Sequence, residues 1–218
     1  MLIEEYCYLS YVENPIVEKY FYGNKKNTDE EWKRIECVTV FITGDEYEIC
    51  EKTSHSWWAS KKKTEYGKGL GNTKENPLAV ERTGLLGQAA LAKVCKLPLD
   101  ITYRENGDKY DNVIAGYKVD IKCAMIDYGQ MLICGRNDRG RYIPLSKDIY
   151  IASYIEFDNL KEKFASVTLV GFVLKKDIDL VLKRGKKGNQ MNYEVDYFKL
   201  RPITKFIKLV LNRKDFSH

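Results

Sequence analysis

Residues Tyr117–Ala124 place a carboxylate beside an ammonium group on one face of a predicted strand. The sequence is Y-K-V-D-I-K-C-A, and successive side chains of a strand point to opposite faces of its sheet. The valine, isoleucine and cysteine form an apolar face that is expected to point into the core. The opposite face carries Lys118, Asp120 and Lys122. A carboxylate and an ammonium group are therefore expected side by side at the surface of this strand.

A second carboxylate precedes this strand at a spacing typical of a hairpin. Asp111 lies in the run K-Y-D-N-V-I-A-G-Y, and the Ala115-Gly116 turn lets the two strands pair. Two converging carboxylates bind a hard divalent cation such as Mg²⁺ or Mn²⁺, which polarises a phosphate and lowers the pKa of bound water. The lysine can orient that water or stabilise charge that develops on the phosphate. With Glu81 upstream as a third acid, the set is suited to phosphodiester hydrolysis.

A simpler interpretation of the same residues stays open. Asp120 and Lys122 can form a surface ion pair on an edge strand, and such a pair contributes little to stability. That interpretation explains the pair but leaves Asp111 and Glu81 unrelated to it.

The elements expected to position these side chains are a helix and the strands that follow it. Apolar and small residues recur at helical spacing from about Pro77 to near Cys95. Short β-rich runs then cover residues 99–104, 110–115, 117–124, 130–135, 149–155 and 166–174. A helix before this series of strands predicts an α/β fold with a mixed sheet.

The regions on either side of this core have other patterns. Residues 36–50 have the pattern of a β-hairpin around T-G-D, and residues 54–76 predict a long loop. Near the other end, residues 177–184 predict a short helix, 193–198 a strand and 204–213 a terminal helix. Trp57 and Trp58 are suited equally to stacking on nucleic acid and to anchoring a core.

The motif residues resemble those of the PD-(D/E)XK nuclease superfamily, because Asp111 and Asp120-Ile121-Lys122 match its motif. The helix V-E-R-T-G-L-L-G-Q-A-A-L-A-K-V is similar to the helix that precedes the motif in many members, and Glu81 matches the acid near its start. The resemblance implies that Asp111 and Asp120 are metal ligands and that Lys122 is the catalytic lysine. It also implies that Glu81 is a supporting acid or water-mediated ligand, and that the backbone carbonyl of Ile121 joins the coordination.

The resemblance covers residues 77–174. It implies a restriction-endonuclease-like core, similar to that of Holliday-junction resolvases, with a mixed four- to five-stranded sheet flanked by helices. Residues 1–76 are expected to form a small N-terminal β-rich unit and a long loop. Residues 175–218 are expected to form a basic C-terminal extension packed on the core.

Positive charge is concentrated toward the C-terminal end. The 218-residue chain has a net charge of +5, whereas residues 161–218 alone carry 14 Lys and Arg against 6 Asp and Glu. A concentrated positive surface suits a polyanion, although a solvated lysine-rich face has the same composition. The cations expected to contact nucleic acid are Lys68, Lys183, Arg184, Lys186 and Lys187.

These features together predict a divalent-metal-dependent DNA nuclease, an endonuclease that hydrolyses duplex or branched DNA. The alternatives are an exonuclease acting from DNA ends and a non-catalytic binding protein, which is favoured by Gln88 where related helices often carry glutamate. A homodimer is expected by analogy with enzymes that cut both strands. No long apolar run or signal pattern is present, so no membrane partner and a cytoplasmic location are expected. The six scattered cysteines predict buried free thiols.

Overall fold

The computed structural model describes residues 6–7, 9, 16–23, 32–61, 76–102, 112–114, 116–136, 141–184 and 191–214. The α-helices in these ranges are α1 (Gly44–Lys61), α3 (Pro77–Cys95) and α4 (Ile203–Lys214). The strands are β1 (Tyr6–Cys7), β2 (Ile16–Gly23), β3 (Trp32–Thr43), β4 (Leu99–Asp100), β5 (Asn112–Ile114), β6 (Tyr117–Ala124), β7 (Gln130–Arg136), β8 (Ile149–Asn159), β9 (Phe164–Leu174), β10 (Leu182–Arg184), β11 (Met191–Asp196) and β12 (Arg201–Pro202). The 3-10 helices are η1 (Lys175–Asp177) and η2 (Tyr197–Lys199).

The largest layer is a mixed β-sheet. Among the described residues it has seven strands in the order β2-β3-β9-β8-β6-β5, with β12 paired to β9. Strands β6 and β8 are parallel, and the other pairs are antiparallel. The predicted α/β fold with a mixed sheet is therefore confirmed. The sheet is larger than the four to five strands expected, because β2 and β3 join it through β9.

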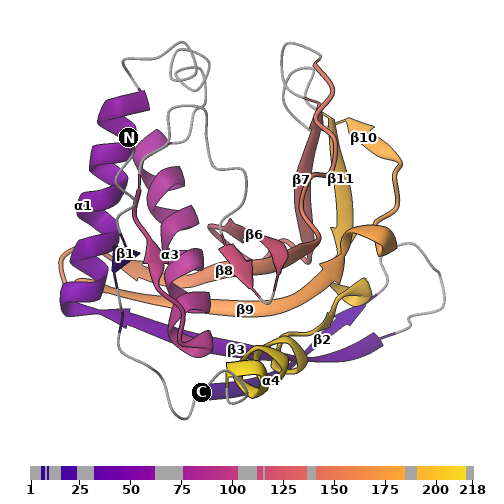
Figure 1. Ribbon diagram of the computed structural model, residues 1–218, viewed down its shortest axis with the longest axis horizontal. Helices are drawn as coiled ribbons and strands as arrows, with labels where there is room; N and C mark the ends of the chain where they lie inside the picture. The colour runs from indigo at the N-terminus through magenta and orange to yellow at the C-terminus, as the bar shows by residue number, and fades with distance from the viewer. Residues whose placement is uncertain are drawn as a thin grey trace.

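The helices α1, α3 and α4 pack on one face of this sheet, and Figure 1 shows α1 and α3 side by side. Their shared core includes Leu86 and Val94 of α3, Phe206 of α4 and Ile151 of β8. In the described part of the chain, no helix is both long and apolar enough to cross a membrane.

A three-stranded antiparallel sheet, β10-β11-β7, covers part of the opposite face. Met131 and Ile133 of β7 and Tyr193 of β11 form a second apolar core with Tyr150 of β8. Figure 1 shows β7 and β11 side by side on the right, at a distance from α1 and α3. The molecule thus has three layers, in which the large sheet separates the helices from the small sheet.

The sequence pattern located the central elements well. Helix α3 and strand β6 have the predicted bounds, and β7, β8, β9, β11 and α4 agree within a few residues. Helix α3 begins as its sequence indicates, because Asn76 Oδ1 accepts a hydrogen bond from Leu78 N at 3.1 Å and Pro77 follows this N-cap.

Three predicted elements are wrong in whole or in part. The loop expected over residues 54–76 does not begin at 54, because α1 continues to Lys61. Residues 36–50 do not form a hairpin, because β3 ends at Thr43 and α1 begins at Gly44, which has a φ of 55°. The buried residues at positions 47, 50, 54 and 57 have helical spacing. The residues before them have high β propensity, which obscured this spacing in the sequence. Residues 177–184 do not form a helix, because β10 pairs with β11 and only the 3-10 helix η1 precedes it.

Buried tyrosines are expected to make the folded protein sensitive to alkaline pH. Burial raises the pKa of Tyr154 and Tyr197 above the ordinary value of 10.0. A hydrogen bond with Tyr142, and then burial, raise the pKa of Tyr193 to about 12. The folded state therefore holds these phenolic protons more tightly than the unfolded state. The stabilisation is present below pH 10 and is lost as the pH rises through the folded-state pKa values, so we expect the urea midpoint, followed by circular dichroism, to fall above pH 10.

A matched pair of variants tests whether buried phenols cause the loss of stability above pH 10. Tyr197→Phe removes one buried phenol and is expected to flatten the fall in the urea midpoint above pH 10. Tyr117→Phe changes an exposed phenol and is expected to leave the fall unchanged. Equal pH profiles for wild type and Tyr197→Phe would contradict the assignment.

Candidate active site

Strand β6 has one apolar face and one polar face, as the alternation of apolar and charged residues in its sequence predicted. Val119 and Ile121 belong to the core beneath the helices, and Cys123 packs against it. Asp120 and Lys122 point to the opposite face, on the side of the small sheet. Strand β6 lies between β5 and β8, so Asp120 is on an inner strand and not on an edge of the sheet.

The carboxylate of Asp120 and the ammonium group of Lys122 form an ion pair, with Oδ2 and Nζ 2.7 Å apart. The Asp120 residue is only 7% exposed, whereas the Lys122 side chain is 38% exposed. The two atoms are within hydrogen-bonding distance but are not aligned as a hydrogen bond, and no other described group donates to Oδ2. The contact is therefore electrostatic. Asp120 Oδ2 remains a buried carboxylate oxygen with unused acceptor capacity.

Tyr150 is a neighbour of this pair that the sequence did not reveal. The parallel register places Tyr150 of β8 beside Asp120 of β6, and paired residues of adjacent strands share a face. Burial raises the pKa of Tyr150, the backbone of Lys147 lowers it, and the charge of Asp120 raises it. The Tyr150 hydroxyl accepts a hydrogen bond from Lys147 N at 3.3 Å. A phenol thus stands next to the carboxylate, and only the strand register could have identified it.

The other predicted metal ligands are placed only in part. Asp111 lies outside the described residues, although the next residue, Asn112, pairs with Val119, the chain neighbour of Asp120. Among the residues that the structure describes, no group of three His, Cys, Asp or Glu side chains could hold a metal ion. Among the described side chains, Asp120 Oδ2 is the buried oxygen without a hydrogen-bond partner, and carboxylate oxygens are ligands that Mg²⁺ and Mn²⁺ prefer. The coordination by the Ile121 carbonyl stays a prediction.

Glu81 lies in the helical layer, on the other side of the large sheet from Asp120. Its Oε1 and Oε2 accept hydrogen bonds from Lys61 Nζ at 2.6 and 2.7 Å, which links α3 to the end of α1. Both side chains are largely buried. The described contacts therefore give Glu81 a structural partner and do not bring it to Lys122, and its role as a supporting acid stays a prediction.

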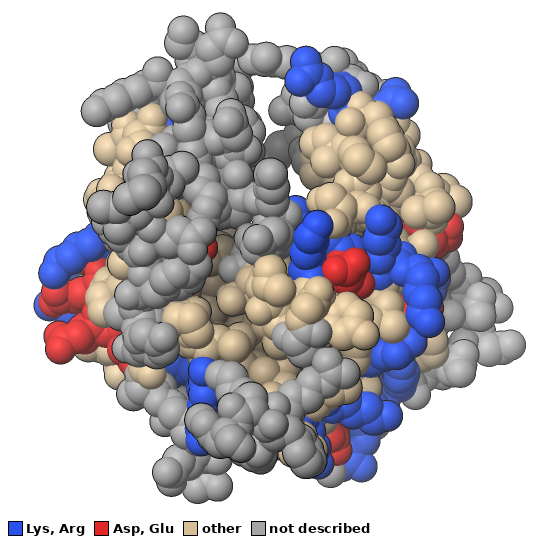
Figure 2. All heavy atoms as spheres, viewed as in Figure 1, with Lys and Arg blue, Asp and Glu red and all other residues tan. Residues whose placement is uncertain are grey.

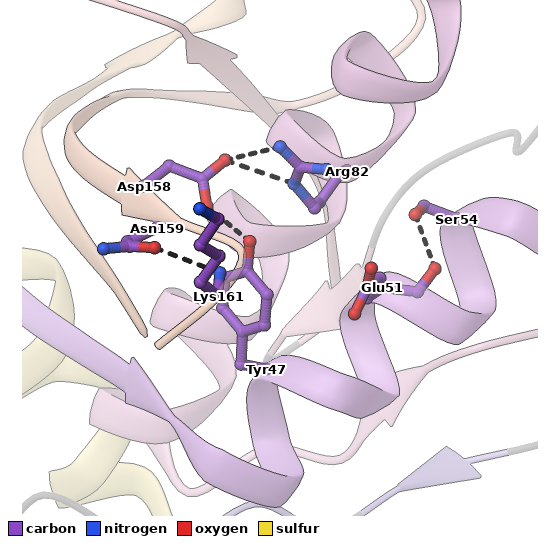
Figure 3. Close-up of polar contacts among 7 residues, drawn as sticks. All are labelled: Tyr47, Glu51, Ser54, Arg82, Asp158, Asn159 and Lys161. Carbon is purple, nitrogen blue, oxygen red and sulfur yellow. Dashed lines mark hydrogen bonds and ion pairs between the residues drawn. The ribbon is translucent and has the colours of Figure 1, made fainter. Parts of the chain in front are cut away.

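A second polar cluster fixes the same helices to the sheet (Figure 3). Arg82 of α3 donates from Nε and Nη2 to Asp158 Oδ2 of β8, at 3.1 and 2.7 Å. The hydroxyl of Tyr47 in α1 donates to the other oxygen of Asp158. Charge-assisted hydrogen bonds of this kind are stronger than neutral ones. The cluster holds α1 and α3 together over the end of β8.

The closest approach of α3 to β6 depends on a glycine. A Cβ atom at Gly87 would lie 2.7 Å from Cys123 Cβ and 3.2 Å from Ser153 Oγ. Burial raises the pKa of the Cys123 thiol to about 12, which disfavours the reactive thiolate, and the side chain packs against the core. Cys37, Cys50 and Cys95 are buried outside any disulfide, as expected, whereas Cys123 and Cys134 are half-buried.

The cations predicted to contact nucleic acid fall mostly outside the described residues. Lys68, Lys186 and Lys187 lie there, and the structure describes the backbone of Arg184 but not its side chain. Lys183 forms an ion pair with Glu194 of the neighbouring strand β11. Trp57, in turn, is buried and donates from Nε1 to the carbonyl of Ile101 at 3.2 Å, which is a core contact.

The ion pair between Lys61 and Glu81 leads to a prediction about stability. Glu81→Gln leaves the ammonium group of Lys61 without its carboxylate, and we expect a loss of about 1–2 kcal/mol in the free energy of unfolding. Urea denaturation measures the loss. Glu162→Gln, which changes an exposed carboxylate in the β8–β9 turn, is the control and is expected to have little effect. If Glu81→Gln abolishes cleavage without lowering stability, Glu81 belongs to the catalytic site.

The described geometry therefore centres on Asp120, Lys122 and Tyr150. Comparisons with protein-family models, curated protein sequences and solved structures found no match.

Proposed function

We propose that the chain is a divalent-metal-dependent DNA nuclease whose active site is centred on Asp120 and Lys122. The observation that carries the proposal is the buried oxygen of Asp120, which has unused acceptor capacity and lies 2.7 Å from the Lys122 ammonium group. A carboxylate used only for structure is normally saturated with hydrogen bonds when it is buried. This arrangement is better explained by a ligand that binds Asp120.

Each residue has a defined task in the proposal. Asp120 binds the cation, with Asp111 and the Ile121 carbonyl as the further ligands that we propose. The half-exposed ammonium group of Lys122 stabilises negative charge on the phosphate that is cut. A bound Mg²⁺ or Mn²⁺ would polarise that phosphate and supply an activated water. Glu81 remains in the proposal as a supporting acid, and the Glu81→Gln variant tests that role.

The proposed substrate is duplex or branched DNA, and the proposed mode is internal cleavage. The net positive charge of the chain supports a polyanionic substrate. Cleavage of both strands would need two active sites close together, so a homodimer is part of the proposal by analogy with other nucleases.

The test compares closed circular plasmid, linear duplex and a four-way junction, each with Mg²⁺, Mn²⁺ or EDTA. We expect cutting of the plasmid or the junction with metal and none with EDTA. Cutting of linear duplex alone would support an exonuclease instead. Binding of all three substrates without any cutting would contradict the proposal and favour a binding protein.

A further inference from the structure

Four lysines gather where the first residues of β6 and β8 meet the end of β9. We call Lys118, Lys147, Lys175 and Lys176 the lysine rim. Lys147 is half-buried, and the other three are exposed. Figure 2 shows many Lys and Arg side chains in the right-hand half of this face, with a few Asp and Glu side chains among them. The rim therefore presents several positive charges close together.

Asp148 holds the segments of the rim in place through its backbone and its side chain. Asp148 N donates to Lys118 O at 2.9 Å, and Lys118 N donates to Asp148 Oδ2 at 2.8 Å. Lys175 N donates to Asp148 O at 2.9 Å. Because these bonds join three strand ends, the spacing of the lysines is set by the sheet and not by a flexible loop.

The charge of the rim is poorly balanced by carboxylates. Within the described part of the chain, none of the four lysines of the rim forms an ion pair. Asp177, which follows Lys176, pairs with Arg201 at 2.7 Å, and Asp179 Oδ1 accepts from Val181 N at 3.2 Å. Asp148 is the carboxylate bonded within the rim, and its hydrogen bonds there are to backbone atoms of Lys118 and Lys175. A polyanion would offset this excess.

We propose that the lysine rim binds the sugar-phosphate backbone of DNA beside the phosphate that is cut. The inference rests on the proposed function for the position of that phosphate. Lys118 and Asp120 lie on the same face of β6, and two residues of a strand span about 6.6 Å. A DNA strand with one phosphate at Asp120 and Lys122 therefore brings neighbouring phosphates within reach of Lys118. Phosphate contacts of this kind set the register of the DNA and not its sequence.

The test measures binding without cleavage, so that it does not depend on catalysis. Fluorescence anisotropy of a fluorescein-labelled duplex is recorded in EDTA between 50 and 200 mM KCl. The triple variant Lys118→Gln, Lys175→Gln, Lys176→Gln is compared with the control triple Lys199→Gln, Lys205→Gln, Lys208→Gln. The control changes three exposed lysines of η2 and α4 and has the same net charge.

We expect the rim variant to lower the slope of log affinity against log salt by about 0.9 for each lysine that contacts a phosphate. At 100 mM KCl its affinity is expected to fall about ten-fold or more, while the control changes less than two-fold. Equal losses in both variants would overturn the proposal, because net charge alone would then explain binding. Wild-type binding to phosphatidylserine vesicles in place of DNA, lost in the rim variant, would also overturn it.

Failure of this proposal is distinguishable from failure of the proposed function. If the rim variant loses DNA binding while the wild type cuts no substrate with any metal, the rim is supported and the nuclease proposal fails. If the wild type cuts DNA and the rim variant binds it normally, the nuclease proposal stands and the rim is wrong.

Discussion

Asp120→Asn is expected to lower metal-dependent cleavage about 10³-fold, equivalent to roughly 4 kcal/mol in the activation free energy. The substitution removes the negative charge that would attract the cation but keeps the size of the side chain. Lys122→Ala is expected to lower cleavage about 10²- to 10³-fold, because the charge on the phosphate then lacks its ammonium partner. Single-turnover cleavage at saturating enzyme, with Mg²⁺ and with Mn²⁺, measures both effects.

Two controls separate these effects from damage to the fold. Glu162→Gln removes an exposed carboxylate in the β8–β9 turn and is expected to leave cleavage unchanged. Lys122→Arg keeps a positive charge and is expected to retain more activity than Lys122→Ala. Circular dichroism and urea midpoints verify that every variant is folded. Wild-type rates in a folded Asp120→Asn variant would remove the basis of the assignment.

Gly87→Ala is expected to lower the free energy of unfolding by about 2–3 kcal/mol, as overpacking of a close core contact typically does. The new methyl group would meet Cys123 Cβ at 2.7 Å, which is closer than carbon atoms approach each other. Helix α3 would have to move away from β6 to admit it. Urea denaturation at neutral pH measures the loss.

Gly84→Ala in the same helix is the matched control. A Cβ at Gly84 meets no atom within 4 Å, so alanine there is expected to raise stability by about 0.5–1 kcal/mol through its higher helix propensity. Opposite signs for the two variants would locate the effect in the contact with β6. Equal effects would mean that the packing of α3 against β6 is looser than the structure indicates.

The elements around the candidate site could be predicted because their patterns are local. Strand β6 alternates over eight residues, and α3 has a cap, a proline and helical periodicity within its own segment. Helix α1 was not predicted, because β-rich residues precede it and its buried stripe at positions 47, 50, 54 and 57, although at helical spacing, includes the polar Ser54.

The features that could not be predicted depend on contacts between distant residues. The joining of β3 to β9 pairs Thr39 with Thr168, and no local pattern reveals that partner. The position of Tyr150 beside Asp120 depends on the register of two parallel strands in the same way. The partner of Glu81 was also hidden, because Lys61 lies in a segment that was predicted to be a loop. Individual side chains could be proposed from the sequence, but their neighbours required the fold.

The most direct test of Asp120 as a metal ligand is a Mn²⁺ titration followed by electron paramagnetic resonance, without DNA, for wild type and Asp120→Asn. We predict that the wild type binds Mn²⁺ and that Asp120→Asn weakens the affinity at least about ten-fold, because a carboxylate ligand carries the charge that a hard cation requires. Equal affinities, or no binding by the wild type, would contradict the assignment of Asp120 and Lys122 as a metal-dependent active site.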